Sequence, residues 1–190
     1  MPRTLKQNLT DAMEAVRFVK GKMRLGSRNQ IGDLLGSWGN SWQCISDLRS
    51  DVDAYESTLG DLHSSNALAA IERVAEFTAS AAARLGCGNC NEQAALAFIC
   101  LRDKGVFPID WVDKLGVAGG NLGGHSFVVV GRIAGKREPA EWGPDAVICD
   151  PHETASAFPA SEFDQYWPRA TLKGKIRLEG KSSMTIRVAF

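Results

Sequence analysis

The first 85 residues carry apolar side chains at the spacing of helices. Leu, Val, Ile and Ala recur every three or four residues, so that each stretch has one apolar face. The pattern predicts a first helix with a Thr10 or Asp11 cap that ends near Lys22, a second over residues 45–59, and a third from Ser65 or Asn66 to Gly86. The Gly- and Ser-rich connection after the first helix holds at most one short helix, around residues 31–35.

The pattern changes after Gly86. Residues 90–102 are apolar on most sides, which predicts a buried central helix beginning at Cys90. Three later runs have the composition of strands: 126–130, 146–149 and 183–190, the last of which alternates apolar and polar residues. Because helices come first and strands later, the sequence predicts an α+β fold with a mostly antiparallel sheet rather than a doubly wound α/β fold.

Length and composition narrow the class of protein. The 190 residues suit one compact domain, with a helical part over 1–85 and a core over 86–190. Lys plus Arg equals Asp plus Glu at 22 each, and a net charge of zero disfavours a nucleic-acid partner. No run approaches the roughly 18 to 20 apolar residues of a membrane span. The N-terminal residues lack the apolar core of a secretory signal, so we expect synthesis in a cytosol. The five cysteines, an odd number, predict free thiols.

Cys90 is the first candidate for chemistry. It follows a Gly-Asn pair at the predicted start of the central helix, where unpaired backbone N–H groups and the positive end of the helix dipole favour a thiolate. Cysteines also serve as small core residues, which is the role expected for Cys44, Cys100 and Cys149. Position along the chain therefore selects Cys90 as the candidate nucleophile.

His125 is the candidate general base. It follows the glycine-rich segment GVAGGNLGG and opens the strand SFVVV. We expect its imidazole to face a cleft there and to reach the N-terminus of a helix packed on the sheet. His152 is the weaker alternative, and His63 falls in a helix end or loop remote from any strand. A surface or purely structural role for His125 is the competing interpretation.

Asp150 is the candidate orienting group. It closes the strand 146–149 and precedes Pro151, which ends strand pairing. If this strand pairs antiparallel with the strand after His125, Asp150 faces the imidazole and can hold its Nδ1–H. Alternatively, the carboxylate only caps the turn DPHET. Weaker rivals for the orienting role are Asp145, Glu138 and Glu153.

Together these residues resemble a known superfamily. The order Cys90, His125, Asp150, with the segments GNCNEQAALAF, HSFVVVG and VICDP, is similar to that of the papain-like and transglutaminase-like cysteine hydrolases. The GNC-x-E-x-A form resembles the mitogenic-toxin type of bacterial effector deamidase, and the likeness covers about residues 84 to 152. It implies a papain-like core whose central helix carries the nucleophile. It also implies that Cys90 is the nucleophile, His125 the general base and then acid, and Asp150 the orienting group.

The resemblance implies a function as well. It predicts deamidation of Gln or Asn side chains in a host protein, without a cofactor or a metal. The enzyme would be a toxin or effector made in the bacterial cytoplasm and delivered into a target cell. A protease and a transglutaminase use the same triad and are alternatives. Two departures from the pattern are the long insertion IAGKREPAEWGPD and the lack of a Gln shortly before Cys90. The candidates for holding an oxyanion are therefore the backbone N–H of Cys90 with Asn89 or Gln93.

Three other interpretations compete with this one. Cys87-x-x-Cys90 could be half of a zinc site or a redox pair, although the sequence shows neither further ligands at a suitable spacing nor a βαβ context. The glycine-rich loop lacks the GK[ST] that follows a phosphate loop. Finally, the chain could be a non-enzymatic interaction protein, with Trp38 and Trp42 as anchors for a partner unless they cap the core.

Overall fold

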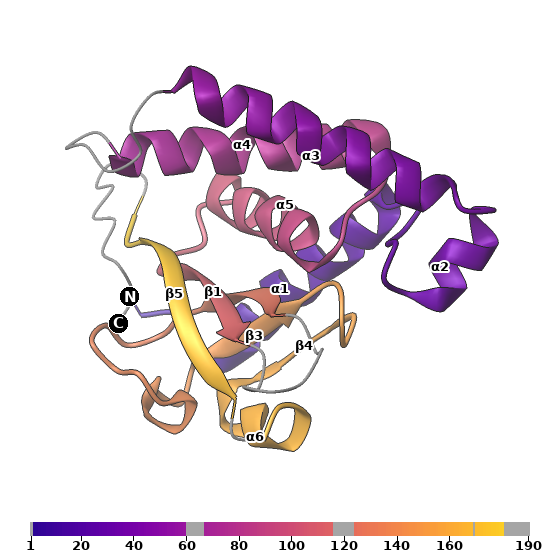
Figure 1. Ribbon diagram of the computed structural model, residues 1–190. Coiled ribbons are helices and arrows are strands. Elements are labelled where there is room, and N and C mark those ends of the chain that lie inside the picture. The colour runs from indigo at the N-terminus through magenta and orange to yellow at the C-terminus, as the bar shows by residue number, and fades with distance from the viewer. Residues whose placement is uncertain (1, 60–66, 116–123, 169, 181–190) are drawn as a thin grey trace.

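The computed structural model describes residues 2–59, 67–115, 124–168 and 170–180, and over these ranges the chain is an α+β protein, as predicted (Figure 1). The helices are α1 (Leu5–Lys22), α2 (Ile31–Gly36), α3 (Asn40–Thr58), α4 (Ala67–Leu85), α5 (Cys90–Asp103) and α6 (Phe163–Tyr166). The strands are β1 (Ile109–Leu115), β2 (His125–Val130), β3 (Val147–Asp150), β4 (Ser156–Pro159) and β5 (Thr171–Leu178). Within the described ranges, no helix combines the length and the hydrophobicity needed to cross a bilayer.

The helices lie where the apolar spacing predicts them, except that two N-termini differ. Helix α3 begins at Asn40, five residues before the predicted start. The cap of α1 is Thr4, not Thr10 or Asp11. The backbone N–H of Thr4 donates to Gln7 Oε1 at 2.9 Å, and the N–H of Gln7 donates back to Thr4 Oγ1 at 3.4 Å. Thr10 lies inside the helix, where its hydroxyl donates to the carbonyl of Lys6 at 2.9 Å. The first turn of α1 therefore precedes the apolar stripe on which the sequence prediction was based.

The sheet is antiparallel, in the order β4-β3-β2-β1-β5. Two of the predicted strands, 126–130 and 146–149, correspond to β2 and β3 within one residue at each end. The apolar pattern does not predict the other three, because charged residues interrupt β1 and β5 and because β4 has only four residues. The predicted strand 183–190 lies outside the described residues.

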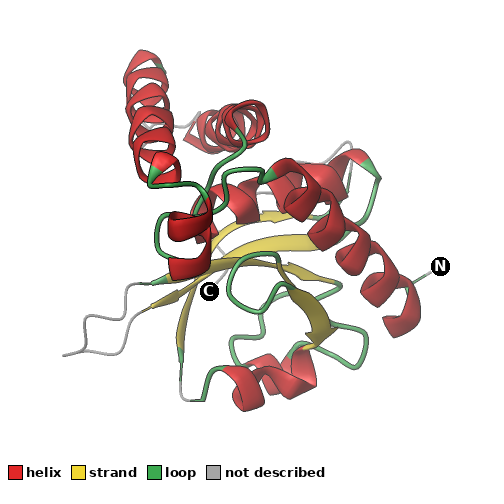
Figure 2. Ribbon diagram, turned by 90° about the vertical axis from the view of Figure 1, so that its right-hand side faces the viewer, coloured by secondary structure: helices red, strands yellow, loops and turns green. Residues whose placement is uncertain are grey.

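Different elements cover the two faces of the sheet (Figure 2). Helices α1 and α5 pack on one face, with α4 against α5 and α3 beyond it. Along β2 the side chains alternate: Val128 and Val130 join the core under the helices, whereas Phe127 and Val129 join a second core on the other face. That second core is aromatic, with Trp142, Phe158, Phe163 and Trp167. By the same alternation, His125 belongs to the aromatic face.

A disulfide joins Cys44 in α3 to Cys87 in the turn before α5, so the prediction of five free thiols is wrong. Cys90, Cys100 and Cys149 are free. Apolar spacing gives no sign of the pairing, because the two partners are 43 residues apart and each fits a core position equally well as a thiol. With Cys87 bonded to Cys44, the Cys87-x-x-Cys90 pair is not available as half of a zinc site or as a redox pair.

We expect removal of this disulfide to lower stability while preserving the fold. Bridging a sequence separation of 43 residues restricts the unfolded chain, and the loop-entropy model gives roughly 4 kcal/mol for a loop of this length. In urea unfolding, a Cys44→Ser/Cys87→Ser double variant should therefore have a lower midpoint than the oxidised wild type. Reduced wild type should match the double variant. Equal midpoints for all three samples would contradict the stabilising role.

A buried ion cluster joins β1 to β5 and to the segment after β2. Asp110 accepts from Arg132 Nη2 at 2.7 Å and from Arg177 Nη1 at 2.6 Å, and all three side chains are buried. Arg177 Nη2 also donates to the carbonyl of Arg132 at 2.9 Å. Arg177 Nε donates to a second carboxylate, Glu179 Oε1, at 2.5 Å. The carboxylate of Asp110 thus pairs with two guanidinium groups inside the protein, which explains a charged residue in a buried strand.

Asp110→Ala should be strongly destabilising, because it removes the buried carboxylate that accepts from both Arg132 and Arg177. Losing one partner of a buried ion pair typically costs about 3–5 kcal/mol. Chemical denaturation monitored by circular dichroism measures this loss. The matched control is Glu141→Ala, which breaks the exposed pair with Lys136 and should cost about 1 kcal/mol or less. A similar small effect for both variants would refute the structural importance of Asp110.

Candidate functional site

The turn before α5 fixes the position of Cys90. The N–H of Leu25 donates to the carbonyl of Gly86 at 2.7 Å, and the N–H of Gly88 donates to the carbonyl of Gly26 at 3.1 Å. Between these bonds, Cys87 carries the disulfide to α3. Gly86 has a φ of +79°, a conformation that glycine adopts without strain. The segment that follows α1 therefore holds this turn through the backbone, and α3 holds it through a covalent bond.

Asn89 caps the helix that begins at Cys90. Its backbone N–H donates to Glu92 Oε2 at 2.9 Å, which is half of a capping box. Glu92 is buried, and its other carboxylate oxygen accepts from Arg49 Nε at 3.0 Å. The capped N-terminus places the Cys90 side chain at the positive end of the helix dipole, as the sequence predicts.

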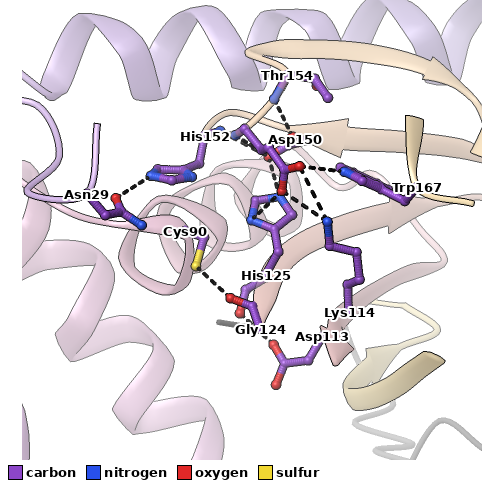
Figure 3. Close-up of polar contacts among 12 residues, drawn as sticks. Asn29, Cys90, Asp113, Lys114, Gly124, His125, Asp150, His152, Thr154 and Trp167 are labelled. Carbon is purple, nitrogen blue, oxygen red and sulfur yellow. Dashed lines mark hydrogen bonds and ion pairs between the residues drawn. The ribbon is translucent and has the colours of Figure 1, made fainter. Parts of the chain in front are cut away.

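Cys90 and His125 come from adjacent layers, the first from α5 and the second from β2 in the sheet on which α5 packs (Figure 3). The Cys90 side chain is partly exposed, and its thiol lies 3.9 Å from the carbonyl oxygen of Gly124 as a weak donor. Since Gly124 directly precedes His125, this contact brings the sulfur to the first residue of β2. The three sequence-predicted residues Cys90, His125 and Asp150 thus lie together at one end of the sheet.

His125 and Asp150 form a buried pair, with 3.0 Å between Nε2 and Oδ1. In the β2–β3 register, Val128 pairs with Cys149 and Val130 with Val147, so position 150 falls opposite position 127, diagonal to His125 on the same face. Two details differ from expectation. The carboxylate contacts Nε2 rather than Nδ1, and the imidazole is only 4% exposed rather than open to a cleft. The aromatic face covers the ring.

Asp150 also organises the turn that follows it. Its Oδ1 accepts from the N–H of His152 at 3.0 Å and of Glu153 at 3.2 Å, and its Oδ2 accepts from the N–H of Thr154 at 2.6 Å. The two roles weighed from the sequence, orienting an imidazole and capping the turn DPHET, therefore both apply to this carboxylate. The turn N–H groups fix the carboxylate, which in turn fixes the ring of His125.

The charges in this pair stabilise each other. Burial alone would lower the pKa of His125, but hydrogen bonding to Asp150 and Cys90 and the charges of both groups raise that pKa to about 9. Burial would raise the pKa of Asp150, but its bond to His125 and the N–H groups of the turn hold the pKa below its usual value. At neutral pH the imidazolium and carboxylate forms are therefore favoured.

An aromatic wall, which the sequence interpretation missed, encloses the ring of His125. Trp167 lies 5.4 Å from His125 between ring centroids, and its Nε1 donates to Glu153 Oε1 at 2.9 Å. The ammonium of Lys114 lies 4.8 Å from the centre of the Trp167 ring and 3.2 Å from Glu153 Oε2. Glu153, one of the rival orienting residues, is 3.6 Å from His125 Nδ1. The consideration of Glu153 as an orienting residue was the one signal in the sequence for this part of the site, because Trp167 and Lys114 belong to no recognisable motif.

His152 lies beside the pair on the other side. Its ring centroid is 5.7 Å from that of His125, and its Nε2 is 3.0 Å from Ser27 Oγ and 3.1 Å from Asn29 Oδ1. Burial, followed by the nearby charge of His125, lowers the pKa of His152 to about 4. The two neighbouring imidazoles thus have opposite preferences: His125 for the charged form and His152 for the neutral form. His63 lies outside the described residues.

The two side chains predicted as oxyanion donors have structural partners. Asn89 Oδ1 accepts from Ser27 Oγ at 2.8 Å and from the N–H of Arg28 at 3.2 Å. Gln93 is fully buried, and its Nε2 donates to the carbonyl of Gly88 at 2.7 Å. Asn89 Oδ1 and Gln93 Nε2 therefore support the turn before Cys90. The first backbone N–H groups of a helix have no partner within the helix, so those at the start of α5 are further candidate donors.

The fold and the site together define an α+β protein with a cysteine, a histidine and an aspartate brought together at one end of an antiparallel sheet. No protein-family model, curated protein or solved structure was found to match the chain. Among the described residues, no group of three or more His, Cys, Asp and Glu side chains is arranged to hold a metal ion. The chemistry open to the site is that of a thiol beside a histidine–carboxylate pair.

Stability should be highest near pH 6.5. The pKa of His125 is raised to about 9, so its contribution is complete below about 6.5 and is lost as pH rises through 9. The pKa of His152 is lowered to about 4, so its contribution is present above about 6.5 and is lost as pH falls through 4. Each difference of about 2.5 in pKa corresponds to roughly 3 kcal/mol.

Thermal unfolding between pH 4 and pH 10 checks both sides of this maximum. His125→Ala should flatten the alkaline side, and His152→Gln should flatten the acid side. A wild-type profile that is flat from pH 6.5 to pH 9.5 would show that the His125 pair does not contribute to stability as described.

Proposed function

We propose that the chain is a thiol-dependent amide hydrolase that deamidates Gln or Asn side chains of a protein substrate. The observation that carries the proposal is the buried His125–Asp150 pair beside a cysteine at a helix N-terminus. A thiol needs a base to become a nucleophile, and the base needs an orienting partner, which is the arrangement of a catalytic triad. The resemblance of GNCNEQAALAF, HSFVVVG and VICDP to cysteine hydrolases supports the same reaction class.

The proposed reaction has two halves. His125 holds the thiol proton as an imidazolium beside the Cys90 thiolate, and the thiolate sulfur attacks the amide carbon to give a tetrahedral oxyanion. Backbone N–H groups at the start of α5 stabilise that oxyanion. His125 then protonates the nitrogen, the C–N bond breaks, and ammonia leaves. A water molecule, deprotonated by His125, hydrolyses the thioester to the carboxylate and restores the thiol. Asp150 stabilises the imidazolium in both halves and stays ionised.

Transglutaminases and proteases are alternatives that share the acyl-enzyme. An amine in place of water in the second half gives transamidation, and a backbone amide in place of a side-chain amide gives proteolysis. The resemblance to effector deamidases favours a side-chain carboxamide and, with it, a toxin or effector made in a bacterial cytoplasm and delivered into a target cell. The disulfide between Cys44 and Cys87 supports exposure to an oxidising compartment during delivery.

Cys90→Ala should abolish release of ammonia from a blocked glutaminyl-glycine dipeptide or from a glutamine-containing protein. Asp150→Asn should lower kcat by roughly 10³-fold to 10⁴-fold, because the imidazolium loses its counter-charge and its orientation. Enzyme-coupled detection of ammonia gives the rate. Intact mass of the substrate identifies the product, because deamidation adds about one dalton, transamidation adds an amine less ammonia, and proteolysis gives fragments.

The matched control is Cys100→Ala, which removes a second free thiol from the same helix and should leave the rate as it is. Iodoacetamide should also modify Cys90 faster than Cys100 near neutral pH, and His125→Ala should reduce that difference. Full turnover by the Cys90→Ala variant would overturn the proposal.

One observation favours a second candidate, a non-enzymatic interaction protein. Trp38 is 93% exposed and has a φ of +53°, and Ile31, Leu35 and Trp42 are also exposed around α2. Exposed apolar residues that cluster in this way are typical of surfaces that bind another protein. A chain that captures a partner equally well with and without Cys90, and that releases no ammonia, would favour this second candidate.

A further inference from the structure

His152 lies beside the proposed triad without being a member of it. Figure 3 shows its ring between Asn29 and the His125–Asp150 pair, and the centroids of the two imidazoles are 5.7 Å apart. His152 lies in the turn that follows β3, and its backbone N–H donates to Asp150 Oδ1 at 3.0 Å, which holds the residue beside the His125–Asp150 pair. His152 is 7% exposed, so the groups that surround its two nitrogens matter energetically.

The contacts of Nε2 determine which nitrogen carries the proton. Ser27 Oγ lies within hydrogen-bond distance of Asn29 Oδ1, Asn89 Oδ1 and His152 Nε2, but a hydroxyl has only one hydrogen to donate. Both amide oxygens are acceptors, so that hydrogen goes to one of them. His152 Nε2 must therefore donate, to Ser27 Oγ or to Asn29 Oδ1 at 3.1 Å.

The other nitrogen, Nδ1, is then a lone-pair acceptor. It is buried and has no hydrogen-bond partner among the described residues. A buried acceptor without a donor is costly, and in a site such an atom marks the place of a missing group. Because burial and the charge of His125 keep the pKa of His152 at about 4, Nδ1 keeps its lone pair at neutral pH.

We infer that His152 Nδ1 accepts a hydrogen bond from the NH₂ group of the substrate carboxamide. This inference rests on the proposed amide hydrolysis and deepens it. A primary amide offers two N–H donors, whereas the ester of the same acid has no N–H group. His152 is therefore a positioning residue that selects carboxamides over esters, while the neighbouring His125 moves the proton.

Two substitutions at this position separate the two nitrogens. In His152→Gln the side-chain nitrogen falls near the place of Nε2, so the donor to Ser27 and Asn29 is kept and the acceptor is lost. In His152→Asn the side-chain oxygen falls near the place of Nδ1, so the acceptor is kept and the donor is lost. The two variants thus distinguish two roles of His152: accepting a hydrogen bond from the substrate carboxamide through Nδ1, and donating a hydrogen bond to the segment of Ser27 and Asn29 through Nε2.

The measurement compares two substrates, a blocked glutaminyl-glycine dipeptide and the γ-methyl ester of its glutamate counterpart. In His152→Gln, kcat/KM for the amide should fall about fivefold to tenfold, the value of one neutral hydrogen bond, with less than a twofold change for the ester. In His152→Asn, the values for both substrates should fall together, so that their ratio stays within about twofold of wild type.

An unchanged amide-to-ester ratio in His152→Gln would overturn the inference while leaving the proposed function in place. If His152→Gln does not fold, a tenfold fall of the ratio in His152→Asn would overturn it instead. Wild-type protein that hydrolyses neither substrate in a Cys90-dependent manner would overturn the proposed function, and the inference with it. Circular dichroism of each variant establishes that the fold is present.

Discussion

The attachment of the turn before α5 is the constraint on which the rest of the site depends. A helix N-terminus can favour reaction of a thiol only if the helix holds the sulfur at a fixed position relative to the histidine. Here the disulfide from Cys87 to α3 and two backbone hydrogen bonds to residues 25 and 26 fix that turn from different layers. The capping box of Asn89 then begins the helix at Cys90. Without these contacts, the turn that precedes Cys90 would be held less firmly relative to the sheet.

The sheet supplies the second half of the geometry. Antiparallel pairing of β2 with β3 puts the first residue of one strand beside the last residue of the other. Side-chain alternation then turns His125 and Asp150 to the same face, over the aromatic core. That core excludes water from the pair, which strengthens their mutual attraction and explains why the imidazole favours its charged form in spite of burial.

The sequence was sufficient for the parts of this arrangement that depend on local pattern. The helix start at Cys90 follows from the change of pattern after Gly86. The place of Asp150 follows from two apolar runs that pair as strands, the second of which ends at Asp150 before Pro151. It was insufficient wherever a contact joins distant segments. The bond from Cys44 to Cys87, the ion cluster around Asp110 and the aromatic wall around His125 have no periodic signature, since each is defined only by packing. The choice of Nε2 over Nδ1 likewise depends on a ring rotation that sequence does not encode.

The two buried histidines show how one small region can assign different roles to identical side chains. His125 faces a carboxylate that is already fixed by three N–H groups, so its positive charge is compensated. The Nε2 of His152 donates to the oxygen of Ser27 or of Asn29, and neither oxygen carries a negative charge that would compensate a charged ring. A second positive charge 5.7 Å from the first would be repelled, so protonation of His125 helps to keep His152 neutral. In the proposed mechanism, proton transfer by His125 and hydrogen-bond acceptance by His152 would therefore fall to two neighbouring rings, and neither role would compete with the other.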